Sequence, residues 1–232
     1  MKKSRMVAII QARMGSTRFP EKVMAKIMGK TMLERIIERI QAARRIDKII
    51  IATSTNKEND RIAIIGRKNK IDVYRGSEED VVDRIYKAAK QAKADVIVRI
   101  TADDPLVDPE LMDRMVGERK RRQLDFLGNS NPETFPHGLN LDVMRMEALE
   151  RLWELTRNPK YHDTFREGMF ENPAKFRIGN YEHENNLSHL RWTVDTREDL
   201  EFMRGVYKHL YTKKRIFLMK DILEFLEVKL RE

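Results

Sequence analysis

Three fixed cations stand within ten positions of one another near the start of the chain. The stretch Val7–Lys22 reads V-A-I-I-Q-A-R-M-G-S-T-R-F-P-E-K, and it carries Arg13, Arg18 and Lys22 after an apolar run. Arginine offers planar forked donors and lysine a compact charge, a combination that suits a nucleoside triphosphate. Gly15 would let the backbone approach such a ligand, and successive amide groups there can form an anion-binding nest. The alternative is a solvated basic loop.

Two aspartates are candidates for the carboxylates of a metal site. Asp103 follows the expected strand Asp95–Ile100, and Pro105 keeps the neighbouring Asp104 out of helical conformation. Asp195 follows an expected extended segment and precedes an expected helix. Mg²⁺ prefers one or two protein carboxylates together with phosphate oxygens and water, which suits this pair. An aspartate before a helix is equally an ordinary N-cap, so the residues alone leave Asp195 open between the two roles.

Alternating strands and helices are expected to position these side chains. The expected strands of the first half are Val7–Ile10, Lys48–Ala52, Ile71–Tyr74 and Asp95–Ile100. Helical patterns follow each of them, beginning at Thr31 with Glu34 in a capping box, and over about 57–69, 80–93 and 109–122. This alternation predicts an α/β fold with a mainly parallel sheet flanked by helices. Ligands of such sheets bind beyond the carboxyl ends of the strands, and all four ends here are polar.

The regular alternation stops after Leu124. Further elements are expected as strands at Leu139–Met144, Phe176–Gly179 and Leu190–Val194, and as helices at Met146–Thr156, His162–Glu171, Arg197–Leu210 and Lys220–Leu230. We expect residues 1–212 to form one nucleotide-binding domain. Within it, residues 125–190 are expected to be an excursion from the main sheet that shapes an acceptor site and an oligomer contact. Residues 213–232 are expected to form a C-terminal helical appendage.

Composition narrows the functional classes. The chain of 232 residues has 41% hydrophobic residues and no cysteine, which excludes thiol catalysis, cysteine-bound zinc and disulfides. No signal-peptide pattern or apolar run of about 18 residues is present, so we expect a cytoplasmic protein without a membrane partner. The net charge is +9, but acids and bases are interspersed, and the one dense basic run, Arg119–Arg122, is typical of a solvated helix end. We therefore expect no nucleic-acid partner.

The loop string resembles the signature loop of sugar nucleotidyltransferases. It is most similar to that of the cytidylyltransferases that make CMP-activated sugar acids, including the spore-coat polysaccharide type and, more distantly, the CMP-Kdo and CMP-sialate synthetases. Arg99–Pro105 and Ser188–Thr196 resemble the two metal-carboxylate motifs of that family. Ala52–Thr55 and Arg75–Asp80 resemble segments that line its nucleotide pocket. The ordinary P-loop spacing and G-x-G-x-x-G are absent.

This resemblance implies a Rossmann-like fold of the nucleotide-diphospho-sugar transferase or GT-A type. It also implies a homodimer that transfers a cytidylyl group from CTP to a sugar or sugar acid and releases pyrophosphate. The residues that it assigns to the nucleotide are Ala12, Arg13, Gly15, Ser16, Arg18, Lys22, Thr53, Ser54, Arg75 and Gly76. It assigns Lys22, Arg13, Arg18 and Asp103 to catalysis, and Asp103 and Asp195 to Mg²⁺.

The chain departs from the family pattern mainly in the expected acceptor half. The family's Asp-Gly-Leu-Asp-Val-Glu-Val appears here as His137–Val143, and its Arg-Glu-His-Val as His162–Phe165. The expected acceptor residues are His137, Asn140, Asp142 and Arg166. Fewer carboxylates beside retained cations predict an anionic acceptor, an acidic or phosphorylated sugar. The alternative is that these substitutions lie on an outer surface.

Two other functions share some of these features. A GT-A-like glycosyltransferase would have the same sheet and a metal aspartate, but it normally needs Asp-x-Asp where this chain has Asp103-Asp104. A non-catalytic nucleotide-binding module is the alternative outside enzymology, and the retained cations and carboxylates argue against it.

Overall fold

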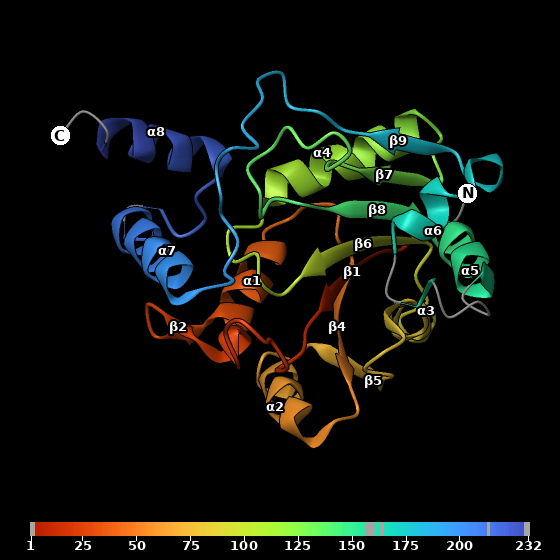
Figure 1. Cartoon of the computed structure of the whole chain (residues 1–232), viewed down its shortest axis with the longest axis horizontal. Coiled ribbons are helices and arrows are strands. Elements are labelled where there is room, and N and C mark those ends of the chain that lie inside the picture. Colours follow the sequence, from red (N-terminus) through yellow and green to blue (C-terminus); the bar gives the residue numbers. More distant parts are fainter. Residues whose placement is uncertain (1–2, 156–160, 163–164, 213, 230–232) are drawn as a thin grey trace.

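A seven-stranded sheet forms the centre of the molecule, in the order β5-β4-β1-β6-β8-β7-β9 (Figure 1). The structure is a computed structural model that describes residues 3–155, 161–162, 165–212 and 214–229. The strands of this sheet are β1 (Met6–Gln11), β4 (Lys48–Ser54), β5 (Asp72–Gly76), β6 (Val96–Thr101), β7 (Phe126–Gly128), β8 (Asp142–Arg145) and β9 (Ile178–Asn180). Among these described strands β8 alone is antiparallel to its neighbours. The expected mainly parallel α/β sheet is confirmed.

Helices cover both faces of the sheet. One face carries α1 (Met32–Ile40), α2 (Asp60–Lys68), α4 (Pro109–Arg121) and α7 (Arg197–Leu210), and the other carries α3 (Val81–Gln91), α5 (Met146–Leu155) and α6 (Glu167–Phe170). The sequence of the central strand β1 is continuously apolar because helices cover it on both faces. Ala8 and Ile10 pack against the helices of the first face and Val7 and Ile9 against those of the second, and all four are fully buried.

Local signals define several helix starts. Thr31 and Glu34 form the expected capping box of α1, and Asp108 caps α4 with Pro109 in its first turn. The short extended piece expected after the loop is a small hairpin, β2 (Lys26–Ile27) with β3 (Lys30–Thr31). The remaining short elements are 3-10 helices at Lys22–Met24, Lys57–Asn59 and Pro173–Lys175.

The structure corrects several expectations between Leu124 and Val194. The segment 125–190 is not an excursion from the main sheet, because β7, β8 and β9 complete that sheet. Strand β7 gave no alternating pattern because it is short and all three of its residues are buried. Leu190–Val194 forms no strand and makes only one isolated bridge, between His137 and Arg191. The expected helix His162–Glu171 is reduced to α6, and residues 163–164 of that prediction lie outside the described residues.

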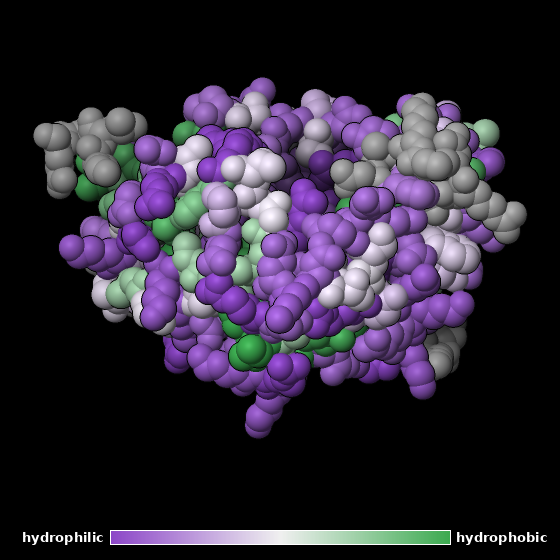
Figure 2. All heavy atoms as spheres, turned by 60° about the horizontal axis from the view of Figure 1, so that its bottom comes forward, coloured by the Kyte–Doolittle hydropathy of each residue, from purple (hydrophilic) through white to green (hydrophobic). Residues whose placement is uncertain are grey.

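The C-terminal segment packs against the main core. Helix α8 (Met219–Lys229) follows Phe217, and Phe217 and Ile222 are both fully buried in the same cluster as α7. None of the helices in the described part of the chain has the length and apolar character that crossing a bilayer requires. Hydrophilic side chains predominate on the face shown in Figure 2.

Candidate active site

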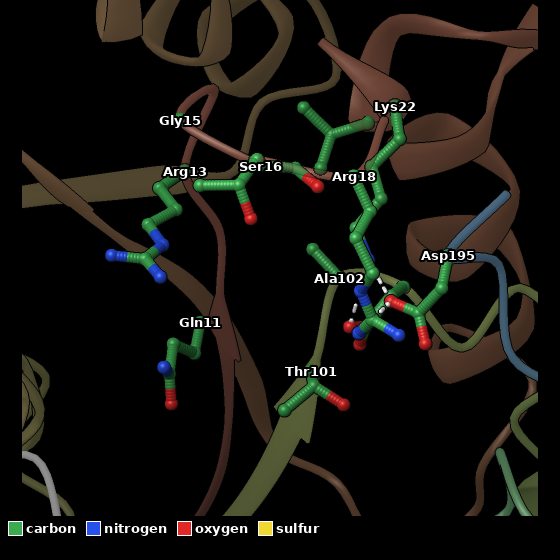
Figure 3. Close-up of a pocket in the computed structure, with 12 residues that line it drawn as sticks. Gln11, Arg13, Gly15, Ser16, Arg18, Lys22, Thr101, Ala102 and Asp195 are labelled. Carbon is green, nitrogen blue, oxygen red and sulfur yellow. Dashed lines mark hydrogen bonds and ion pairs between the residues drawn. The ribbon is translucent and has the colours of Figure 1, made fainter. Parts of the chain in front are cut away.

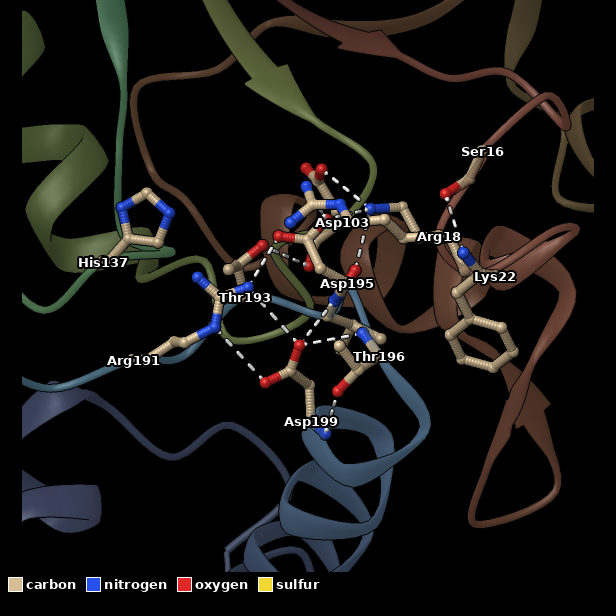
Figure 4. Close-up of polar contacts among 12 residues, drawn as sticks. Ser16, Arg18, Lys22, Asp103, His137, Arg191, Thr193, Asp195, Thr196 and Asp199 are labelled. Carbon is tan, nitrogen blue, oxygen red and sulfur yellow. Dashed lines mark hydrogen bonds and ion pairs between the residues drawn. The ribbon is translucent and has the colours of Figure 1, made fainter.

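Lys22 lies between the two aspartates that the sequence singled out. Its Nζ donates to Asp103 Oδ2 at 3.1 Å, to Asp195 Oδ1 at 2.9 Å and to the carbonyl of Val194 at 2.8 Å (Figure 4). Lys22 itself is only 9% exposed. An ammonium group that is removed from water in this way needs compensating acceptors, and the two carboxylates supply them. The loop after β1, the loop after β6 and the segment before α7 therefore meet at one side chain.

The loop between β1 and Lys22 lines a cavity of about 240 Å³ (Figure 3). Of the predicted residues, Arg13, Gly15, Ser16, Arg18, Lys22, Asp103 and Asp195 all line it, together with Gln11, Thr17, Val23, Thr101 and Ala102. The Met14 amide donates to the buried Asn59 side chain at 2.8 Å, and the amides of Ser16 and Glu21 donate to the Met14 carbonyl. Within the described residues, the amides of the cavity-lining Gly15, Thr17 and Arg18 have no protein acceptor. Such amides are suited to receive an anion.

Asp195 does not cap the helix that follows it. Thr196 is the N-cap of α7 and forms a capping box with Asp199. The carboxylate of Asp195 instead binds Lys22, Arg18 at 2.9 Å and Arg191 at 2.6 Å. Burial acts to raise the pKa of Asp195, but hydrogen bonds from Lys22 and Arg191 outweigh it and lower the pKa. The ordinary N-cap interpretation of Asp195 is therefore wrong, and the residue faces the cavity as an anion.

The two acidic segments are cross-linked to each other through the backbone. The Val194 amide donates to the Asp103 carbonyl at 2.9 Å, and the Thr193 hydroxyl donates to the same carbonyl at 3.3 Å. Gly138 packs against this junction with φ +109°, and a Cβ at that position would lie 2.4 Å from the Trp192 carbonyl carbon and oxygen. Only glycine allows both this backbone conformation and this close approach. The separation of Asp103 from Asp195 is consequently set by well-packed backbone.

Asp104, the neighbour of Asp103, is buried rather than solvated. Burial and the charge of Asp103 raise the pKa of Asp104 to about 7. Its Oδ2 accepts a hydrogen bond from the Thr101 hydroxyl at 2.6 Å. The loop after β6 thus carries one carboxylate at this cavity and a second, Asp104, that is costly to ionise and lines an adjoining cavity.

A second cavity, of about 290 Å³, adjoins the first and shares Arg18, Thr101, Asp103 and Asp195 with it. His137, Asn140 and Arg166, three of the four expected acceptor residues, line it. The Asn140 side-chain oxygen is buried and has no partner among the described residues. These departures from the family pattern therefore do not lie on an outer surface. They form the wall of a cavity next to the first one.

The fourth expected acceptor residue, Asp142, lies behind this wall. It is 1% exposed, and its two oxygens accept from Arg99 Nη1 and Arg166 Nε, each at 2.8 Å. Arg99 also donates to Gln11 Oε1 at 3.0 Å and lies over the ring of Phe165. One carboxylate thus holds two guanidinium groups at the second cavity, and the trio carries a net positive charge.

Five of the predicted nucleotide residues do not line either cavity. Ala12 is buried beside β4, where its amide donates to the Ala52 carbonyl. Thr53 and Ser54 are fully buried, and the Ser54 hydroxyl accepts from Asn59. Arg75 donates to the carbonyls of residues 54–56 and to Asp60, so it braces the loop after β4. Gly76 lies at the end of β5, where a Cβ would approach the Tyr74 ring to 2.8 Å. The contact of Ala12 with the nucleotide stays a prediction, as does contact of the other four residues with base or ribose.

Several residues of the site were not singled out from the sequence. Arg191 and Asp199 position Asp195, and the Thr196–Asp199 spacing matches a capping-box signature that could have revealed the true cap. Arg99 is a charged residue inside an apolar strand, which was a further signal. No spacing in the sequence pointed to Thr193, because its partner lies 90 positions away.

Asp103 and Asp195 are the carboxylates at the cavity that could hold a hard divalent cation. Asp103 and Asp195 present carboxylate oxygens to one point, the Lys22 ammonium. In the described part of the chain there is no group of three or more His, Asp or Glu side chains that could hold a metal. Two carboxylates without a complete protein cage match the way Mg²⁺ is held together with substrate phosphates.

A parallel sheet whose first strand ends in a cationic loop, with two aspartates across the same cavity, defines an enzyme of the nucleotidyltransferase class. The family model described as cytidylyltransferase matches residues 7–222, and the chain belongs to that family. The resemblance seen in the sequence motifs is thereby confirmed, and the glycosyltransferase and non-catalytic alternatives are set aside.

Individual proteins agree with this assignment. The spore coat polysaccharide biosynthesis protein SpsF of Bacillus subtilis is 33% identical over 213 residues, which is 86% of this chain and 85% of that protein. The structure of a cytidylyltransferase from Leptospira borgpetersenii has a TM-score of 0.91 at 31% identity and covers 98% of this chain and 95% of that one. A 3-deoxy-manno-octulosonate cytidylyltransferase of Geobacter metallireducens is 32% identical over 112 residues, 48% of this chain and 43% of that protein. The fold is the Rossmann-like fold of these nucleotidyltransferases.

Proposed function

We propose that the enzyme transfers the cytidylyl group of CTP to an acidic or phosphorylated sugar. A sugar hydroxyl attacks the α-phosphorus, an oxygen–phosphorus bond forms, and the bond to the leaving pyrophosphate breaks. The observation that carries the proposal is that two cavities, one beside the cationic loop and one beside the paired arginines, share Arg18, Asp103 and Asp195. A nucleotide in the first and a sugar in the second would meet at these shared residues.

The cavity beside the loop provides charge complementary to a triphosphate. Arg13 and Arg18 are more than half exposed, so both can turn toward a ligand at little cost. Lys22 is held at the two carboxylates, where it would stabilise charge on the phosphates of a bound nucleotide. Asp103 and Asp195 would hold Mg²⁺, which supplies charge neutralisation and orientation of phosphate oxygens. Alignment and charge neutralisation are the main demands of this displacement.

The second cavity favours an anionic acceptor. Arg166 presents its guanidinium from a buried ion pair with Asp142, and Arg99 is held on the other oxygen of the same carboxylate. Planar guanidinium groups fixed in this way suit a carboxylate or a phosphate. One relative is named 3-deoxy-manno-octulosonate cytidylyltransferase, and the sugar in that name is acidic. Asp142 would then act on the acceptor through the two arginines.

The test is pyrophosphate release with CTP, Mg²⁺ and a panel of neutral and acidic sugars. We expect an acidic or phosphorylated sugar to give the highest kcat/KM, and Arg166→Ala to lower that value by about 10²-fold while sparing neutral sugars. Arg204→Ala, an exposed arginine of α7 outside both cavities, is the matched control and should leave the ranking unchanged. If a neutral sugar ranks first and Arg166→Ala does not alter the order, the anionic-acceptor proposal is wrong. Pyrophosphate release with any sugar would still support cytidylyl transfer.

The assembly and location of the enzyme are separate proposals. We propose a homodimer in the cytoplasm, in keeping with the resemblance drawn from the motifs. Light scattering coupled to size-exclusion chromatography measures the mass directly, and a mass of one chain would contradict the dimer. Cell fractionation tests the location.

A further inference from the structure

We propose that the chain has a second anion site, for a compact phosphate-bearing ligand, at the opposite end of the strands from the active site. A cavity of about 560 Å³ lies where β6 begins and β8 ends. Its charged lining residues are Arg119 and Lys120 from α4, Arg145 from β8, Arg177 from the segment before β9, and the acids Asp95 and Glu147. The active-site residues follow the carboxyl ends of β1 and β6, so the two sites lie at opposite ends of these strands.

Positive charge exceeds negative charge in this cavity, because four cations and two carboxylates line it and a third carboxylate, Asp125, pairs with Arg177 at 3.6 Å. Asp95 is already engaged, because its Oδ2 accepts the Arg5 amide at 2.6 Å. Glu147 accepts from Arg145 at 3.2 Å. The helix dipole accounts for cations at the carboxyl end of α4, but it does not account for Arg145 and Arg177, which come from other elements. The excess charge is therefore assembled by the tertiary fold.

Arg119 is a buried cation that lies close to another cation of this cavity, Arg145. It is only 7% exposed, and Nη1 donates to the Leu124 carbonyl at 2.9 Å. Its Nε is buried without a partner among the described residues. Burial and the nearby charge of Arg145 lower the pKa of Arg119, and the opposing charges of Asp125 and Glu147 compensate this only in part. A buried guanidinium beside a second one is costly unless an anion compensates both, and an anion in the cavity would do so.

The basic run Arg119–Arg122 is not simply the solvated helix end that its composition predicts. Arg119 is buried and Lys120 lines the cavity with it. Arg121 points to the outside and pairs with Glu118 at 2.6 Å, and Arg122 donates to the Asn180 carbonyl. The run therefore offers two cavity residues and, in Arg121, an adjacent arginine of the same helix turn that lies outside the cavity.

The ligand class follows from these donors. Forked guanidinium groups from two or more elements suit a tetrahedral phosphate oxyanion, which accepts several charge-assisted hydrogen bonds. The cavity is larger than one phosphate needs, so it admits inorganic phosphate, pyrophosphate or the phosphate end of a sugar phosphate. All three share the chemistry that the lining recognises.

The test measures binding of inorganic phosphate and of pyrophosphate by titration calorimetry at constant ionic strength. The background is the double variant Arg13→Ala, Arg18→Ala, which weakens phosphate binding at the active-site loop through two exposed side chains. We expect one saturable site in this background. Arg145→Ala should raise its Kd by about ten-fold or more, and Lys120→Ala should raise it in the same direction. Arg121→Ala, which removes the same charge outside the cavity, should change the Kd by less than about two-fold.

Three results would overturn the proposal. Absence of saturable binding in the double-variant background would show that the phosphate interaction belongs to the active site. Equal losses in Arg145→Ala and Arg121→Ala would show general charge screening rather than a site. An unchanged Kd in both Arg145→Ala and Lys120→Ala would place the ligand elsewhere. Unfolding curves of each variant without ligand confirm that the comparison is made between folded proteins.

Discussion

Lys22 is the side chain through which the active site is held together. Its three acceptors lie 81, 172 and 173 positions further along the chain. Because these acceptors come from two segments, the loop after β6 and the segment before α7, the lysine contacts both aspartates at once. Arg18 and Arg191 also form ion pairs with Asp195, so three cations contact that carboxylate directly.

Replacing Lys22 with alanine should reduce kcat by about 10²–10³-fold, by analogy with loss of a single transition-state donor. The fold should persist, because Lys22 begins a single-turn 3-10 helix beside the cavity and contributes little apolar packing. Steady-state pyrophosphate release and far-UV circular dichroism measure the two effects. Lys30→Ala, which removes a lysine paired with Glu38 far from the cavity, is the control and should keep activity. Wild-type activity and CTP affinity in Lys22→Ala would contradict the role assigned to the loop.

Substitutions at Asp195 and at its neighbour Thr196 should affect different properties, activity for the first and stability for the second. Asp195→Asn should lower activity by about 10² or more, because an amide lacks the anionic oxygen that Lys22 and Mg²⁺ prefer. Thr196→Ala should lower the free energy of unfolding by about 1 kcal/mol, since it removes the true cap of α7. Urea denaturation and initial rates are measured on both variants. Wild-type activity of the Asp195→Asn variant would contradict a role of this aspartate in catalysis.

At the scale of elements, the loop after β6 combines two carboxylates with different surroundings. Asp103 contacts Lys22 at the cavity, whereas Asp104 is buried and is bound by the Thr101 hydroxyl. Burial and the Asp103 charge raise the pKa of Asp104 to about 7 from an ordinary value of 3.8. A raised carboxyl pKa gives a contribution to stability that is complete below the ordinary value and is lost as the pH rises through the folded value. The loop should therefore become less stable between about pH 4 and pH 7.

Asp104→Asn should stabilise the protein increasingly over this pH window. Each pH unit between the unfolded and folded pKa changes the difference by about 1.4 kcal/mol at most, so the total is of the order of a few kcal/mol. Above about pH 7 the difference should level off. Thermal unfolding of wild type and variant from pH 4 to pH 9, in buffer with a chelator, measures it. A difference that does not vary with pH would show that Asp104 does not titrate in this range.

At the scale of the whole molecule, the C-terminal segment is tied to the loop that carries the aspartates. The Arg39 guanidinium is 2% exposed and donates to the carbonyls of Val107 and Phe217, both at 2.7 Å. Asp108 caps α4 with one oxygen and accepts the Met219 amide with the other, at 2.7 Å. The segment that follows Asp103 and Asp104 is therefore braced from behind by α8.

Phe217→Ala should destabilise the whole protein by about 3–5 kcal/mol, because a fully buried aromatic ring is lost from the shared core. Val228→Ala, at a residue that is 58% exposed, is the control and should change stability by less than about 0.5 kcal/mol. Urea denaturation followed by circular dichroism and tryptophan fluorescence should show one transition in each case. A separate early transition would mean that α8 unfolds as an independent appendage.

Local chemistry in the sequence was sufficient for much of the architecture. The apolar runs at β1, β4 and β6 are readable because buried parallel strands must be apolar on both faces. Thr31 with Glu34, and Asp108 with Pro109, mark helix starts because a cap satisfies backbone amides within a few residues. The cationic loop and Asp103 were likewise identified from residue types at the ends of strands, whereas the residues alone left Asp195 open between a metal ligand and an N-cap.

The arrangement of those parts was decided only by the tertiary structure. Strand β7 pairs with β8 and β9 through its backbone, and three buried residues leave no periodic trace of that pairing. Asp195 reaches Lys22 rather than the start of α7 because Thr196 and Asp199 already satisfy the amides there. Arg75 donates to backbone carbonyls and to Asp60, and Asp142 accepts from Arg99 and Arg166. All of these partners lie at least 15 positions away in the sequence, so only the fold brings them together. The sequence determined which groups are available for chemistry, and long-range packing determined which of them meet.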